Sequence, residues 1–98
     1  MIRISLTETA LQGINEGFWF YEDQEVGLGD YFESCIKSDI NGLRVTAGIH
    51  REIHRYNRLL SRVFPHSIYY TFANNKVTVW AVVDNRRDPK WIKDRLPR

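Results

Sequence analysis

Four arginines in the second half of the chain have the chemistry to bind phosphate. Arg58 and Arg62 lie four residues apart in a segment with the two-residue period of a strand, and Arg86 and Arg87 are adjacent where a short apolar run ends. A planar guanidinium can hold two phosphate oxygens at once. Three further residues can act as an acid or base beside such cations: Glu52, His54 and His66. These residues are the candidates for phosphate chemistry.

Arg86 and Arg87 also allow a structural role. Either can pair with a nearby aspartate, such as Asp84, and tie down the last segment of the chain. Exposed ion pairs contribute only about 0–1 kcal/mol, so stability alone is a weak reason for two adjacent arginines. We expect one arginine to anchor the chain and the other to face a partner. The predicted target-binding surface consists of Arg86, Arg87, Lys90 and Trp91.

The distribution of charge supports an anionic partner. The net charge is +2, but residues 1–49 carry three basic and eight acidic residues, whereas residues 50–98 carry eleven basic and four acidic residues. All three histidines also lie in the second half. Such asymmetry is typical of a surface that meets something anionic, and a solvated basic face is the alternative interpretation.

Consecutive aromatic residues predict a second binding surface. Phe18, Trp19, Phe20 and Tyr21 occupy successive positions of a predicted helix, where side chains about 100° apart point in all directions. We expect Trp19 or Phe20 to be exposed or to lie in a groove. Single exposed aromatics are also common on ordinary surfaces. The predicted protein-binding residues are Phe18, Trp19 and Phe20, with Trp80 as a second patch.

Composition places the chain among soluble globular proteins of one domain, which we expect to span residues 1–98. The sequence is 43% hydrophobic and 27% charged, and its apolar runs are too short to cross a bilayer. Its beginning lacks the pattern of a signal peptide. Cys35 is the only cysteine, which excludes an intrachain disulfide and fits a reducing compartment. We expect a cytoplasmic protein with no metal, cofactor or membrane contact.

The first half predicts an edge strand followed by two helices. Residues 2–6 alternate like a strand, and Thr7 or Thr9 can cap the first helix. Its apolar face is formed by Leu11, Ile14, Phe18 and Tyr21. Ala10, Gly13 and Gly17 form a stripe of small residues, which we expect to pack against the second helix. That helix is predicted to start at Asp30, as N-cap, and to stop at Gly48.

The second half predicts three strands and a short helix. Residues 56–63, 66–72 and 77–83 have the period of strands, and Asn74-Asn75 suits a two-residue hairpin turn. We expect one inward face on the last strand, formed by Val77, Val79, Ala81 and Val83. Asp88 and Pro89 suit the start of a helix that ends near Leu96. The predicted fold is α+β, in the order β-α-α-β-β-β-α, with a helical hairpin packed on a small antiparallel sheet.

Four segments in this order resemble the RelE/ParE superfamily of bacterial toxins, and the resemblance covers essentially the full chain. They are GLGDYF at residues 27–32, Arg58-Leu59, the run RVFPHSIYY at residues 62–70, and AVVDNRRDPKW at residues 81–91. The resemblance implies the toxin of a type II toxin–antitoxin system, held inactive by a cognate antitoxin that binds the aromatic surface.

The resemblance leaves the target open between two branches. RelE-like members cut messenger RNA on the ribosome and generally bring a tyrosine or histidine from their C-terminal end, whereas ParE-like members poison DNA gyrase. No Tyr or His follows Arg87 in this sequence. We therefore favour a ParE-like gyrase poison that is not an enzyme. A ribosome-dependent mRNA endonuclease and an inactive member that only binds antitoxin are the alternatives.

Overall fold

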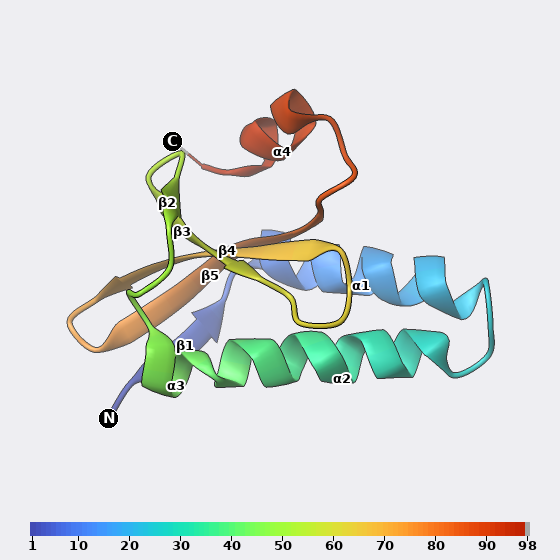
Figure 1. Ribbon diagram of the computed structural model, residues 1–98, viewed down its shortest axis with the longest axis horizontal. Helices are drawn as coiled ribbons and strands as arrows, with labels where there is room; N and C mark the ends of the chain where they lie inside the picture. Colours follow the sequence, from blue (N-terminus) through green and yellow to red (C-terminus); the bar gives the residue numbers. More distant parts are fainter. Residues whose placement is uncertain (98) are drawn as a thin grey trace.

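The computed structural model describes residues 1–97 and confirms the α+β class (Figure 1). The predicted helices and strands are present, but the second helix, expected to continue to Gly48, is divided at Gly42 into α2 and a short α3. The short strand β2 was not indicated by the sequence pattern. In chain order the elements are β1 (Arg3–Leu6), α1 (Glu8–Glu22), α2 (Leu28–Asn41), α3 (Leu43–Thr46), β2 (Glu52–Ile53), β3 (Tyr56–Leu60), β4 (His66–Ala73), β5 (Lys76–Asp84) and α4 (Pro89–Arg95).

The sheet is mixed rather than antiparallel, which corrects one prediction. Its strand order is β1-β5-β4-β3-β2, and β1 runs parallel to β5, while the other pairs are antiparallel. Two hydrogen bonds flank the parallel pair, from Arg3 N to Asn75 O at 2.9 Å and from Thr7 N to Val79 O at 3.0 Å. Alternation in a sequence predicts a strand but carries no information about its direction, so the residues of β1 could not reveal this pairing.

An irregularity in β5 divides the strand between two cores. Tyr69 pairs with Ala81 but Tyr70 pairs with Val79, so Trp80 is an extra residue that shifts the register. After Trp80 the odd-numbered side chains of β5 point to the other face of the sheet. Val77, Val79 and Val82 therefore belong to one buried cluster, and Ala81 and Val83 belong to another. The prediction of a single inward face on β5 was therefore wrong.

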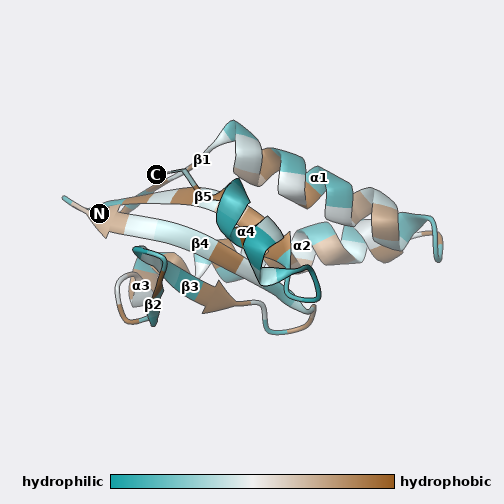
Figure 2. Cartoon of the chain, turned by 90° about the horizontal axis from the view of Figure 1, so that it is seen from above, coloured by the Kyte–Doolittle hydropathy of each residue, from teal (hydrophilic) through white to brown (hydrophobic). Residues whose placement is uncertain are grey.

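The two cores lie on opposite faces of the sheet. The larger one packs the sheet against the α1–α2 hairpin and includes Phe32, Ile36 and Tyr70. The smaller one lies under α4, whose Ile92 and Leu96 pack on β4 and β5. From above, α4 crosses these two strands (Figure 2). Within residues 1–97, no helix has the length and apolar character that a membrane span requires.

Gly13 brings α1 into close contact with β5, not with the second helix as the small-residue stripe suggested. A Cβ atom at this position would lie 2.2 Å from the carbonyl oxygen of Val82. Gly17, one turn later, does face α2, because its Cβ would lie 2.4 Å from the ring of Phe32. The stripe thus serves two neighbours, and the first sets the distance between helix and sheet.

Most predicted caps and turns are confirmed. Thr7 accepts a hydrogen bond from Ala10 N, and Asp88 accepts one from Lys90 N. Asn74 and Asn75 have φ angles of 53° and 59°, as a type I′ turn requires.

The predicted N-cap of α2, Asp30, is wrong. Gly27 (φ 92°) caps this helix, and the Glu22 carboxylate accepts hydrogen bonds from the backbone N–H groups of Gly27 and Gly29 at 3.0–3.1 Å. The Glu22 side chain of α1 therefore accepts hydrogen bonds from the backbone N–H groups that an N-cap side chain would otherwise accept.

Replacement of Gly13 by alanine is expected to destabilise the fold. The added methyl group collides with the backbone of β5, and overpacking of this kind costs about 1–3 kcal/mol, more than the gain of up to about 1 kcal/mol in helix propensity. Urea unfolding measures the change. Asn15→Ala, at an exposed position of the same helix, is the control and should be neutral or slightly stabilising. A Gly13→Ala protein as stable as the wild type would contradict the close contact.

Candidate functional site

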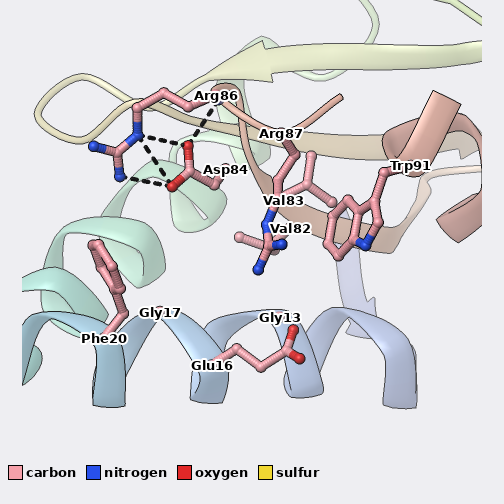
Figure 3. Close-up of a pocket in the computed structure, with 10 residues that line it drawn as sticks. All are labelled: Gly13, Glu16, Gly17, Phe20, Val82, Val83, Asp84, Arg86, Arg87 and Trp91. Atoms are coloured by element: carbon pink, nitrogen blue, oxygen red, sulfur yellow. Dashed lines mark hydrogen bonds and ion pairs between the residues drawn. The ribbon is translucent and has the colours of Figure 1, made fainter. Parts of the chain in front are cut away.

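A groove of about 300 Å³ lies between α1 and the segment that joins β5 to α4 (Figure 3). Two of the four α1 residues that line it, Gly13 and Gly17, are glycines. The lining residues are Gly13, Glu16, Gly17 and Phe20 from α1, Val82, Val83 and Asp84 from β5, Arg86 and Arg87 from the connecting segment, and Trp91 from α4. Apolar walls with a few charged groups at the rim are suited to binding a segment of another molecule.

Arg86 is held by an ion pair at one end of the groove. Its guanidinium donates to both carboxylate oxygens of Asp84, at 2.7 Å from Nη2 to Oδ2 and 3.0 Å from Nε to Oδ1. The hydrogen bonds from Arg86 lower the pKa of Asp84 and, reciprocally, raise the pKa of Arg86. The Arg86 guanidinium also lies 5.7 Å from the centre of the Phe20 ring. Arg86 therefore fixes the end of β5 against α1.

Arg87 is placed differently. Its guanidinium lies 4.5 Å from the centre of the Trp91 ring and extends toward α1 (Figure 3). Arg95 lies over the same indole at 4.1 Å and reaches Glu16 at 4.0 Å. Within residues 1–97 Arg87 forms no ion pair. A stacked but unpaired cation at the rim is available to a carboxylate or phosphate of a partner.

The two arginines from the β3 region do not join this groove. Arg58 donates from Nε to Ser67 Oγ at 2.9 Å, and Ser67 in turn donates to Asn85. Arg62 lies past the end of β3 and lines a separate groove beside α2, with Asp39 and Val63. Arg86 and Arg87 share the groove, whereas Arg58 and Arg62 lie outside it and apart from each other. Their separation arises because β3 ends at Leu60, before the two-residue alternation can bring Arg62 onto the face of Arg58.

None of the three candidate proton-transfer residues lines the groove. His66, at the start of β4, is only 4% exposed, and its ring centre lies 4.8 Å from that of Phe32. Glu52 is on β2, and His54 is in the turn that follows it. Within residues 1–97, no cluster of three metal-ligating side chains occurs.

His66 and Tyr21 are buried with their rings close together, an arrangement that sequence reasoning missed. The His66 Nδ1 and the Tyr21 hydroxyl are both buried without a hydrogen-bond partner in the structure, and the two ring centres are 6.0 Å apart. Burial lowers the pKa of His66 and raises the pKa of Tyr21. Nearby Asp84 raises the pKa of both groups, and nearby Arg86 lowers the pKa of both groups. The helical spacing of Tyr21 indicated its burial, but only tertiary packing brings it to His66.

The aromatic residues of α1 are divided between surface and core. Trp19 and Phe20 are 55% and 51% exposed, Phe18 is half-buried against Trp19, and Tyr21 is buried. Of these residues, Phe20 lines the groove. Trp80 is elsewhere: it is half-buried, and its Nε1 donates to Thr71 Oγ1 at 2.9 Å. Lys90 is exposed and does not line the groove.

Comparison with known proteins connects the chain to a solved structure by its fold. No protein-family model matches the sequence, and no curated protein matches it. The fold is similar to that of a chain in the structure of a chromosomal ParDE TA system from P. aeruginosa, with a TM-score of 0.73 and 13% sequence identity. The alignment covers 86% of this chain and 96% of that chain. The fold expected from the RelE/ParE resemblance is thereby confirmed.

The burial of His66 predicts a loss of stability in mild acid. Because burial lowers the pKa of His66 below its usual value of about 6.5, this residue binds a proton at a higher pH in the unfolded chain than in the native state. The free energy of unfolding should therefore fall as the pH drops below about 6.5, with a limiting slope of about 1.4 kcal/mol per pH unit for one proton. Chemical denaturation at several pH values measures this slope.

His66→Phe should make the slope shallower, because it removes the proton-binding group and keeps an aromatic ring beside Phe32. His50, whose pKa is also lowered by burial, should account for part of the remaining slope. An unchanged pH dependence in His66→Phe would exclude His66 as its source.

Proposed function

We propose that this protein is the toxin of a type II toxin–antitoxin system and acts in the cytoplasm. Its fold, shared with a chain of a ParDE system, supports the proposal. The observation that carries it is the groove between α1 and α4, which combines an exposed aromatic residue with an unpaired arginine. Toxins of this kind need one surface to reach a target and one to be covered by an antitoxin, and this groove borders both predicted surfaces.

The antitoxin is proposed to bind across the exposed aromatic side of α1 and into the groove. Phe20 lines the groove, with Trp19 and Phe18 beside it on the helix. Aromatic side chains at the edge of an apolar groove are typical anchors for a partner segment. Because Phe20 and Arg87 line the same groove, an antitoxin segment bound there would also cover Arg87. Trp80 lies outside this surface, so its predicted antitoxin contact would require a separate part of the partner.

DNA gyrase is the proposed target, contacted through the Arg86–Trp91 segment. Arg86 is fixed by Asp84, whereas Arg87 and Lys90 are exposed cations on either side of the α4 N-terminus. The mRNA endonuclease alternative needs a proton donor or acceptor beside the cations. His66 is buried, and Glu52 and His54 lie on the β2–β3 hairpin, so the groove geometry favours the non-enzymatic role.

A paired assay is expected to separate the possible activities. The purified protein should reduce supercoiling by gyrase or cause cleaved DNA to accumulate, and should leave labelled message intact in a reconstituted translation mixture. Cuts at defined positions in the message would overturn the gyrase proposal in favour of the endonuclease. No effect in either assay, together with normal growth on expression, would leave only an antitoxin-binding protein.

Single substitutions are expected to separate target binding from antitoxin binding. Arg87→Ala should relieve growth arrest, because it removes the unpaired cation but leaves Phe20 in place. Phe20→Ala should weaken antitoxin binding at least about tenfold, the usual cost of losing an interface anchor, while growth arrest persists. Growth assays and calorimetric titration with the antitoxin measure the two effects.

Leu11→Ala serves as the matched control for Phe20→Ala. Leu11 is on the same helix with a similar exposure, 54%, but outside the groove. It should leave antitoxin binding nearly unchanged. Equal losses for Leu11→Ala and Phe20→Ala would show that the groove is not the binding site.

A further inference from the structure

The β2–β3 hairpin ends in a turn made of two non-glycine residues with positive φ. Ile53 pairs with Tyr56, so His54 and Arg55 form the turn, with φ angles of 54° and 74°. The other two-residue turn of the sheet uses Asn74 and Asn75, which adopt this conformation more readily. Arginine in particular is unfavourable there, since it has neither the freedom of glycine nor the local hydrogen bonding of asparagine. His54 and Arg55 therefore occupy a turn whose backbone conformation does not favour these residue types.

The hairpin is anchored firmly although it is short. Arg58 N donates to Arg51 O at 2.9 Å, and Asn57 Nδ2 donates to His50 O at 2.9 Å. Ile53 and Tyr56 pack against the small core under α4. The tip is thus held in place, and its exposed side chains, His54 and Arg55, are presented from a fixed base.

The hairpin and α4 form one basic surface. The Tyr56 hydroxyl donates to Pro97 O, which joins the end of the α4 segment to the hairpin, and Figure 1 shows both on the same side of the sheet. Residues 51–58 contain three arginines and one glutamate, and residues 89–97 contain three basic residues and one aspartate, a combined net charge of +4 in a chain whose net charge is +2. Arg51 and Arg55 are exposed and form no ion pair within residues 1–97.

The acidic residues are concentrated across the sheet. Residues 8–41, which span α1 and α2, contain eight acidic residues and one lysine. This separation repels a polyanion from the helical side and orients it toward the hairpin and α4. Arginine side chains on a narrow, projecting turn are suited to phosphate oxygens along a nucleic-acid backbone, which guanidinium groups bind through paired hydrogen bonds.

We propose that the β2–β3 hairpin, together with α4, binds the phosphate backbone of a nucleic acid without reading its sequence. The β2–β3 hairpin lies outside the groove at Phe20 and Arg87, although α4 borders both through Trp91. The inference does not depend on the proposed toxin activity. The phosphate can belong to duplex DNA or to single-stranded RNA, and separate titrations distinguish the two sources.

The test is a turn replacement that keeps the fold. His54→Asn combined with Arg55→Asn gives the hairpin the same residues as the Asn74-Asn75 turn, so its melting temperature should be unchanged or higher. Fluorescence anisotropy with a short labelled DNA duplex and with a labelled RNA strand, over a range of salt concentrations, measures binding. The double variant should bind about fivefold more weakly, as expected for one lost arginine–phosphate contact. The slope of log K against log salt should become shallower by about one.

Lys76→Gln is the matched control. Like the double variant, it removes one positive charge at a two-residue hairpin, but Lys76 follows the turn of the β4–β5 hairpin. Its affinity for both nucleic acids and its salt slope should stay near those of the wild type. Equal effects of the two variants would overturn the proposal, because total charge and not the hairpin would then govern binding. Absence of binding to either nucleic acid at low salt, or equally effective competition by polyglutamate, would also overturn it.

Discussion

The close contact between α1 and β5 determines the arrangement of the other elements. At Gly13 the helix backbone reaches the Val82 carbonyl with no side chain between them. This contact brings Gly17 onto the Phe32 ring and therefore fixes where α2 lies. It also places Phe20 one turn further along the helix, opposite Arg86 at the end of β5. The groove lies where α1 comes this close to the sheet, and both glycines are among its lining residues.

The sequence allowed the elements to be predicted where local chemistry determines them. Thr7, Asp88 and the Asn74-Asn75 pair act through neighbours a few residues away, so their roles as caps and turn are visible in the pattern. The parallel pairing of β1, the extra residue at Trp80 and the strand facing Gly13 depend on contacts between distant segments. Short-range periodicity contains no information about such contacts, and the predictions that relied on it for β5 and for the glycine stripe were wrong.

The candidate site was predictable in its residue types but not in its grouping. The sequence identifies Arg87, Trp91 and Phe20 from charge, position and expected exposure, but it predicts Phe20 on a different surface from the other two. Their meeting depends on the path of the chain after β5. The location of His66 was not predictable either: its residue type made it a candidate acid or base beside the arginines, whereas it packs against the aromatic rings of Tyr21 and Phe32.

The small core under α4 is expected to be less stable than the larger core on the other face of the sheet. Ile92 and Leu96 hold this helix against Tyr69, Ala81 and Val83, while the sheet separates them from the larger core. Detaching α4 therefore exposes much less apolar surface than unfolding the whole domain, and local opening of this kind takes less free energy. Amide hydrogens of the last helix would exchange with solvent long before those of β4. The Arg87 guanidinium can stack on Trp91 only while α4 remains packed on the sheet.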